Sequence, residues 1–233
     1  SDLFTSSKRL EEVNKSLEEL REKDDELLKQ WEKEKQEIVT AKNLKKQLEE
    51  ARFNLDIALS HSEYEKAGEL QYKIIPELEK KLKAEEEIRF RGLSEEIAAH
   101  PDYQSMKKLI AHGRNTVYDH SINVARLAFK LSSRLHLSCD EKDLVTGALL
   151  HDFYLYDWHD ASIRVPLFQM HGFTHPFTAG RNAEERFDIS WKVKNIIQSH
   201  MYPMTLNTPP ASREAWTVCL ADKIIATEEL FRR

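Results

Sequence analysis

The sequence has little of what several common classes of protein require. It holds only two cysteines in 233 residues, Cys139 and Cys219, which lie far apart and in apolar helical contexts. Such thiols indicate a reducing compartment and not a disulfide-linked scaffold, so we expect a cytoplasmic protein. No apolar run approaches the roughly 20 residues of a membrane span, and no signal peptide is visible. We therefore expect no membrane partner.

Charge and catalytic motifs exclude further classes. The net charge of −5 gives no broad electrostatic reason to bind nucleic acid or anionic lipid, so no nucleic-acid partner is expected. The sequence contains no GxSxG, no Walker A motif and no CxxC. An enzyme built on this chain must take its nucleophile from another source.

Glycine and proline are scarce in one part of the chain only. Residues 1–91 hold one proline and one glycine, and 42 of these 91 residues are charged. The remaining 142 residues hold six prolines, five glycines and nine of the ten histidines, and 33 of them are charged. Such a shift marks two kinds of structure. We expect a domain of residues 1–91 and a second of residues 92–233, with the boundary near Phe90–Gly92.

The first part has the periodicity of packed helices. Apolar residues spaced three and four apart form three stripes, which begin at Leu10, Leu44 and Tyr64. Thr40 is the expected cap of the second helix. Ser62 and Glu65 form a capping-box pair for the third, and Pro76 is expected to kink it. The pattern predicts an antiparallel helical coiled-coil arm.

The amino-acid sequence of this part is more specific than its apolar periodicity. WEKEKQEI and EKAGELQYKIIPELEKKL resemble the middle coiled-coil domain of ClpB-type AAA+ disaggregases, although Lys73 or Ile74 stands where that family usually has glycine. In that family the domain contacts a partner chaperone and regulates an ATPase ring, so the resemblance implies a protein partner for the arm. The chain itself has no ATP-binding motif. A plain structural hairpin is the alternative, and the fusion can be natural or engineered.

The second part predicts an all-α fold. Expected helices are a short one from Ser94 to Ala99, Tyr103 to Ala111 capped by Asp102, Thr116 to Leu135, Leu144 to His151 capped by Asp140, one starting at Pro176, Val193 to His200 capped by Ser190, and one from Ser212 to Phe231. Residues 157–172 and 202–210 are expected to be loops. Several histidines and aspartates then fall at helix ends, where a metal cleft can form.

The chemistry is concentrated in one ordered set of side chains. The adjacent pair in LLHDF can serve two ions at once, because the imidazole holds one and the carboxylate bridges to the next. The set is His120, His151, Asp152, His175, His200 and Asp222. Asp222 lies in the apolar run VCLADKI, and a buried carboxylate needs a partner such as a metal. Imidazole with carboxylate suits Fe, Mn, Zn, Co or Ni, and two such ions about 3.5–4 Å apart can clamp a phosphate.

The order H…HD…H…H…D resembles the two-metal branch of the HD-domain superfamily. The resemblance covers residues 93–233 and implies that His120, His151, Asp152 and Asp222 are core ligands, with Asp152 as the bridge. It implies that His175, followed by proline, and His200 serve the second metal. The closest resemblance is to small bacterial HD proteins with HGxxHPxxA and LADKI motifs. The fold implied is an HD-domain helical bundle.

Other polar and aromatic residues near these motifs have open roles. Lys223 is a candidate phosphate contact in catalysis, and Arg114 and Lys107 are further phosphate candidates. His171 is either a substrate contact or a loop residue. Four residues after the HD pair either stack on a base or pack a loop, and two aspartates can orient the ligand histidines. These are Tyr154, Tyr156, Asp157, Trp158 and Asp160, with Asp157 in both groups.

The sequence thus predicts a phosphohydrolase with two divalent transition metals. Its substrate is expected to be a small phosphate ester or anhydride such as a nucleotide, attacked by a metal-bridging hydroxide. A nucleotide-sensing or partner-binding module with a coiled-coil interaction arm is the rival hypothesis. An engineered coiled-coil fusion of an HD hydrolase is the third. The substrate, the metal and the oligomeric state stay open.

Overall fold

The computed structural model describes residues 2–111, 115–157 and 170–231. Most of these residues lie in helices, and an isolated antiparallel bridge between Ile110 and Thr116 is their only β pairing. The all-α prediction is therefore confirmed. The chain divides into two compact units, residues 1–89 and 90–233. None of the described helices is long and apolar enough to cross a membrane.

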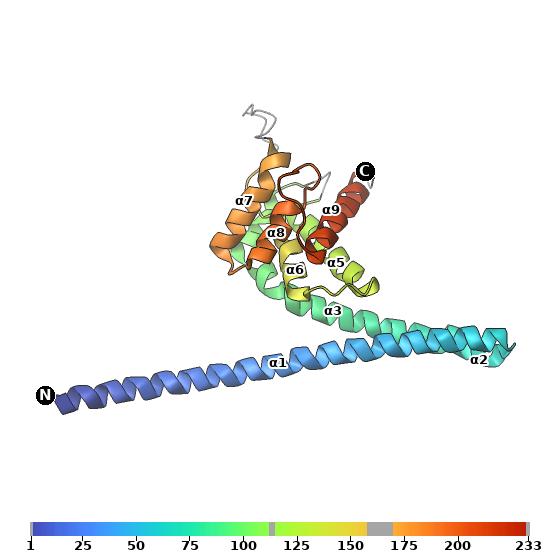
Figure 1. Ribbon diagram of the computed structural model, residues 1–233, viewed down its shortest axis with the longest axis horizontal. Coiled ribbons are helices and arrows are strands. Elements are labelled where there is room, and N and C mark those ends of the chain that lie inside the picture. The colour runs from blue at the N-terminus through green and yellow to red at the C-terminus, as the bar shows by residue number, and fades with distance from the viewer. Residues whose placement is uncertain (1, 112–114, 158–169, 232–233) are drawn as a thin grey trace. The chain divides into compact units, whose positions relative to one another are not determined.

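The first unit is a hairpin with one very long helix. Helix α1 runs from Asp2 to Ser60, and the chain then reverses into α2 (Tyr64–Glu69), the π-helical turn η1 (Leu70–Ile74) and the start of α3 (Ile75–Ala99). Figure 1 shows this reversal and the return of α3 beside α1. The Arg52 guanidinium donates to the Glu79 carboxylate at 2.8 Å across the hairpin. The predicted antiparallel helical arm is therefore present.

Several predicted details of this arm are wrong. The first two expected helices are one, and the Thr40 hydroxyl donates to the Gln36 carbonyl one turn back in place of capping a new start. Ser62 has a φ of 59°, and α2 begins after Glu63 without a side-chain cap, so the expected capping box is absent. Local sequence suggested breaks that the intrahelical hydrogen bonds of α1 override. Pro76 is the second residue of α3, which begins where the π-helical turn ends.

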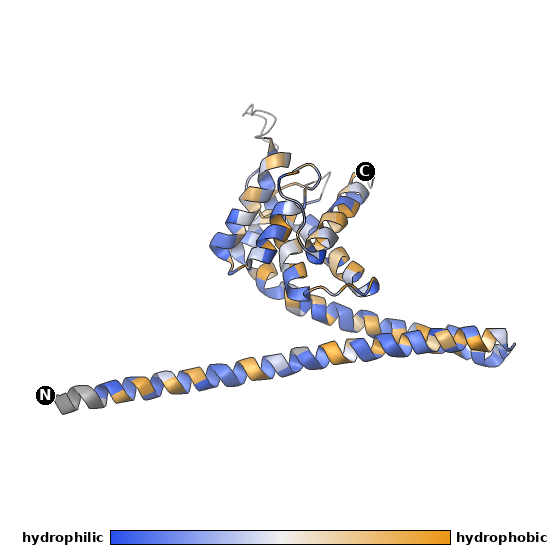
Figure 2. Ribbon diagram, in the orientation of Figure 1, coloured by the Kyte–Doolittle hydropathy of each residue, from blue (hydrophilic) through white to orange (hydrophobic). Residues whose placement is uncertain are grey.

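The apolar stripe of α1 is buried only along part of its length. Ala41, Leu48, Ala51 and Ala58 are buried within the hairpin. The earlier residues Leu10, Val13, Leu17 and Leu20 are 41–66% exposed. Apolar residues nevertheless recur among the charged ones along this end of α1, as Figure 2 shows. The stripe predicted a packed helix here, and within the described residues of this chain that packing is not found.

The second unit is a bundle of helices around one apolar core. It holds the end of α3, then α4 (Pro101–Ser105), the 3₁₀ turn η2 (Met106–Lys108), α5 (Val117–Arg134), α6 (Glu141–Leu150), α7 (His171–Arg186), α8 (Trp191–Ser199) and α9 (Arg213–Phe231). Helix α5 packs against α6 and α9, and α8 packs against α6, α7 and α9. The buried core residues come from all of these long helices.

The predicted caps of two helices, Asp140 and Ser190, are confirmed, and Thr116, expected as the first residue of its helix, is a third cap. The side chains of Thr116, Asp140 and Ser190 accept hydrogen bonds from backbone N–H groups three residues later, at the starts of α5, α6 and α8. Such bonds satisfy amide donors that have no partner inside the helix. These caps fix where α6 and α8 begin. They thereby help to set where both helices end, which is where the site lies.

Three other helix limits differ from the prediction. The expected short helix at Ser94 is the end of the continuous helix α3, and the helix after Pro101 ends at Ser105, with His100 and not Asp102 as its cap. Helix α7 begins at His171 and contains Pro176 in its second turn. The missing N–H of Pro176 would bond near the helix start, where one lost bond is tolerated. The expected loop of residues 157–172 is thus shorter, and its residues 158–169 lie outside the described part.

Candidate metal centre

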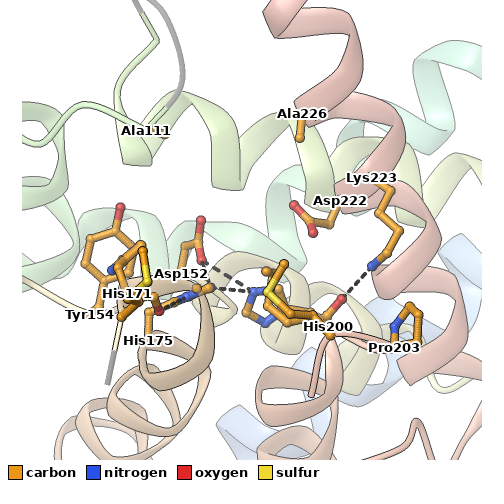
Figure 3. A pocket seen from close by; sticks show the side chains of 14 residues that line it. Ala111, Asp152, Tyr154, His171, His175, His200, Pro203, Asp222, Lys223 and Ala226 are labelled. Carbon is orange, nitrogen blue, oxygen red and sulfur yellow. Dashed lines mark hydrogen bonds and ion pairs between the residues drawn. The ribbon is translucent and has the colours of Figure 1, made fainter. Parts of the chain in front are cut away.

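Five helices bring the predicted ligands to one place. His120 lies on α5, His175 on α7 and Asp222 on α9, while His151 and Asp152 follow the last residue of α6 and His200 follows the last residue of α8. All six side chains belong to buried residues. Figure 3 shows Asp152, His175, His200 and Asp222 around one cavity. The six residues are those that the sequence, through their types, their order and the family resemblance of that order, predicted as ligands.

The carboxylate of Asp152 lies between two sets of histidines. Its Oδ2 atom is 3.6 Å from Nε2 of His151 and 3.9 Å from Nε2 of His120. Its Oδ1 atom is 3.2 Å from Nε2 of His175 and 3.6 Å from Nε2 of His200. Two groups of donor atoms can each hold a metal ion, namely His120, His151 and Asp152, and Asp152, His175 and His200. Asp152 is the member common to both groups.

Asp222 lies beside the first of these groups. Its Oδ1 atom lies 3.2 Å from Nε2 of His120 and 3.7 Å from Nε2 of His151. The same four residues were expected from the sequence to be the core set. The remaining two, His175 and His200, form the other side of the cavity wall.

The hydrogen bonds of the four imidazoles fix their orientation. Nδ1 of His151, His175 and His200 lies 2.7 Å from the carbonyl oxygens of Ala148, His171 and Ile197. A carbonyl can only accept, so each Nδ1 carries the proton and each Nε2 keeps its lone pair. Nδ1 of His120 lies 2.9 Å from a carboxylate oxygen of Glu229. All four Nε2 atoms therefore face the centre, as metal-binding imidazoles do.

This donor set fits a cation. Nε2 of His175 and Nε2 of His200 are 2.9 Å apart, and two lone pairs at that distance repel unless a positive charge lies between or beside them. Nε2 of His151 and Oδ1 of Asp152 are buried and have no hydrogen-bond partner. Buried acceptors without partners cost free energy. A metal ion bound to these atoms would remove both costs.

The pKa shifts differ between the two sides of the site. Burial opposes a charged His120, but its hydrogen bonds with Asp222 and Glu229 outweigh burial and raise the pKa of His120 to about 10. Burial also opposes the charged form of Asp152, yet the adjacent His151 and His175 hold the pKa of that carboxyl well below its usual range. Burial, together with His151 and His175, lowers the pKa of His200 to about 3. The His120 side of the site therefore attracts positive charge.

Sequence reasoning missed Glu229. Its side chain is buried, its Oε2 atom contacts Nδ1 of His120 at 2.9 Å, and its Oε1 atom has no hydrogen-bond partner. Glu229 lies seven residues after Asp222, which is two turns of α9 and hence the same helix face. That spacing was the signal in the sequence that could have placed Glu229 beside Asp222 at the site. The partner on α5 is 109 residues away in the chain and could not be read from it.

The two lysines predicted as phosphate contacts both interact with other groups of the protein. The Lys223 ammonium donates to the His200 carbonyl at 2.9 Å, to the Cys219 carbonyl at 3.3 Å and to the Cys219 sulfur at 3.2 Å. Figure 3 shows the first of these contacts beside the cavity. The predicted contact of Lys223 with a phosphate stays a prediction. The Lys107 ammonium lies 4.5 Å from the centre of the Tyr118 ring.

The aromatic residues after the HD pair pack around His171. The Tyr154 ring meets the His171 ring edge-on at 4.6 Å between centroids, and the Tyr156 hydroxyl is 3.0 Å from Nδ1 of His171. His171 in turn stacks on His175, with centroids 4.5 Å apart and planes inclined by 19°. His171 thus belongs to a helix and lines the cavity. Arg114, Trp158 and Asp160 lie outside the described residues.

Comparison with known proteins finds a likeness for each part of the chain. Residues 117–227 match the family model of the HD domain, a family of metal-dependent phosphohydrolases. Matches to the chaperone protein ClpB cover the N-terminal part. They include those of Brucella suis (44% identical over 98 residues, 42% of this chain and 11% of that protein) and Mesorhizobium japonicum (46% over 99 residues, 42% and 11%). The chain thus spans about a tenth of the length of these relatives. No solved structure matches.

Proposed function

We propose that the HD domain of this chain hydrolyses a phosphate ester or anhydride with the help of two divalent transition-metal ions, and that nucleotides are candidate substrates. The observation that carries the proposal is the position of Asp152, whose two oxygen atoms face separate pairs of histidines. A carboxylate in that position can hold two ions at a fixed separation. The family match at residues 117–227 supports the reaction type.

The ligand roles follow from the distances. His120, His151 and Asp222 would hold one ion with Oδ2 of Asp152, and His175 and His200 would hold the other with Oδ1. Mixed imidazole and carboxylate donors suit Fe, Mn, Zn, Co or Ni better than Mg or Ca. When bound, such ions supply charge that polarises the phosphate and makes water a nucleophile near neutral pH.

The rest of the site holds these ligands in place. The carbonyls of Ala148, His171 and Ile197 keep three imidazoles turned inward, and Glu229 does the same for His120. Lys223 ties the first turn after α8 to α9 through the His200 carbonyl. Its proposed contact with a phosphate would require the ammonium to leave that carbonyl.

Metal analysis combined with a substrate panel tests this proposal. Protein purified without chelator and then saturated with metal is expected to hold about two ions per chain, and to release phosphate from at least one ester or anhydride. The panel would include nucleoside mono-, di- and triphosphates and aryl phosphates. A metal content below half an equivalent, measured by elemental analysis, would contradict the two-metal site.

A second candidate function concerns residues 1–89. The exposed stripe of Leu10, Val13, Leu17 and Leu20 continues the stripe that is buried within the hairpin, and ClpB-like sequence supports an arm that binds a protein. Another helix is the occupant that such a stripe fits. Light scattering would test self-association, with a mass above 27.3 kDa expected for the wild type and a monomer for a variant with Leu10, Leu17 and Leu20 replaced by glutamine.

A further inference from the structure

The residues that line the cavity at the candidate metal centre form two chemically different groups, which we call its walls. The cavity has a volume of about 940 Å³. One wall carries the imidazoles of His171, His175 and His200 and the carboxylates of Asp152 and Asp222. The other is formed by apolar side chains, among which Met170, Met201, Met204 and Pro203 stand closest in sequence to the ligand-bearing helices α7 and α8. A ligand bound here would therefore meet charge at one end and hydrocarbon and thioether groups at the other.

The methionine wall is accessible and adaptable. Met170 is 47% exposed and Met204 is 51% exposed, although both are large apolar side chains. The Met204 sulfur lies so close to α7 that a Cβ atom added to Gly172 would be 3.3 Å from it. Met204 thus reaches from the turns after α8 to the first turn of α7. Flexible thioethers fill irregular space around apolar and aromatic groups.

The described cavity wall has little positive charge of its own. Lys223 is the single lysine or arginine among the described lining residues, and its ammonium donates to three protein acceptors. Asp152 and Asp222 add two negative charges to the same wall. They would leave two of the four positive charges of a divalent ion pair for the substrate and the attacking hydroxide. That remaining charge is closer to the needs of a single phosphoryl group than to those of a polyphosphate.

We propose that the substrate is a phosphomonoester with a single phosphoryl group and an apolar, ring-sized organic group. The inference rests on the proposed function and narrows it. The phosphoryl group lies at the histidine and aspartate wall, and the organic group lies against Met170, Met201 and Met204. Among nucleotides, monophosphates fit this division and triphosphates do not. Hydrolysis transfers the phosphoryl group to water and releases the organic alcohol, so no oxidant or further reactant is needed.

Equilibrium binding of phosphonates tests the inference apart from turnover. Full-length protein loaded with Mn²⁺ would be titrated calorimetrically with benzylphosphonate, methylphosphonate and adenosine 5′-methylenediphosphonate. Benzylphosphonate is expected to bind about tenfold more tightly than methylphosphonate, because the ring buries apolar surface on the methionine wall. The diphosphonate is expected to bind less tightly than benzylphosphonate.

Two variants test whether the methionine wall causes the preference for benzylphosphonate over methylphosphonate. Met204→Gln keeps the length of the side chain and makes it polar, so it should remove most of the benzyl preference and leave methylphosphonate binding unchanged. Leu206→Gln is the matched control in the same turn segment, because Leu206 is 73% exposed and is not among the described lining residues. It should keep the full preference.

The outcomes separate this inference from the proposed function. Equal affinity for benzyl- and methylphosphonate, or tighter binding of the diphosphonate, would overturn the apolar monoester and leave the metal-dependent hydrolase standing. Failure of every phosphonate and of inorganic phosphate to bind the metal-loaded protein would overturn both. Equal losses in Met204→Gln and Leu206→Gln would also overturn the assignment of the apolar wall.

Discussion

Asp152 has the most demanding position of any single residue, since each of its carboxylate oxygens faces a different pair of imidazoles. Asp152→Asn keeps the shape of the side chain but replaces one oxygen by an NH₂ group that cannot ligate. We expect the variant to lose at least one equivalent of metal and to lose hydrolytic activity by orders of magnitude. Elemental analysis and initial rates measure the two effects. Asp188→Asn, at an exposed position, is the matched control.

Near-normal metal content and activity in a folded Asp152→Asn protein would contradict the bridging role. Circular dichroism establishes whether the variant is folded. Loss of activity in the Asp188→Asn control would instead indicate a general effect of removing surface charge.

A substitution at Glu229 tests how the orientation of the His120 imidazole affects metal binding, because the imidazole itself stays in place. Its carboxylate holds Nδ1 of His120 at 2.9 Å, so that Nε2 faces the cavity centre. Glu229→Gln keeps an acceptor but removes the negative charge that strengthens the imidazole as a ligand. We expect metal affinity to fall about 10–100-fold, measured by competition with a chelator. Glu228→Gln, at the exposed neighbouring position, should leave the affinity unchanged, and equal losses in both variants would contradict the role.

At the level of helices, α6 and α8 approach closely at Gly147. A Cβ atom added there would lie 2.5 Å from Cγ2 of Ile196. Alanine favours a helix over glycine by about 1 kcal/mol, but overpacking of a tight core costs about 1–3 kcal/mol. We expect the clash to dominate, so that Gly147→Ala lowers the free energy of unfolding, measured by urea denaturation.

Gly92 supplies the matched control for that prediction. It lies in α3, and a Cβ atom added there would have no neighbour within 4 Å. Gly92→Ala should therefore raise the stability by roughly 0.5–1 kcal/mol. A Gly147→Ala protein that is also stabilised would show that α6 and α8 can separate without cost.

The helices that were predicted correctly are those whose limits are set locally. Thr116, Asp140 and Ser190 cap the residues that follow them, and a cap needs only its own three neighbours. Thr40 has the same chemistry but lies inside α1, where continuous backbone bonding on both sides outweighs it. Asp102 was expected to cap the helix that follows it, but the ring of His100 is the cap in the structure. The choice between two adjacent caps depends on packing that a single sequence does not contain.

The residues of the candidate site also divide into those that the sequence predicts and those that depend on the fold. The types and order of residues, together with the family resemblance of that order, were enough to group His120, His151, Asp152, His175, His200 and Asp222. Glu229 needed knowledge of which face of α9 meets α5. The contacts of Lys223 needed the position of the chain after α8. Residues that act through a distant partner could not be predicted without the fold.

At the scale of the whole molecule, the two compact units meet within the continuous helix α3, between Arg89 and Phe90. Phe90 is 4% exposed, its ring lies 5.9 Å from that of Phe129, and the Arg126 guanidinium lies 4.6 Å from its centre. All three residues belong to the second unit. A cut placed after Arg91, where composition suggests the boundary, would therefore remove a core side chain.

Two truncated proteins test where the functional unit begins. Residues 90–233 contain all proposed metal ligands, so this protein is expected to bind metal and hydrolyse the same substrate at a rate within about twofold of the full chain, since its core is complete. Residues 92–233 should show the same chemistry but a free energy of unfolding lower by about 3 kcal/mol, because burial of Phe90 is lost. Phe90→Ala in the full chain should reproduce that loss. A folded, metal-loaded protein of residues 90–233 without activity would show that the arm completes the site.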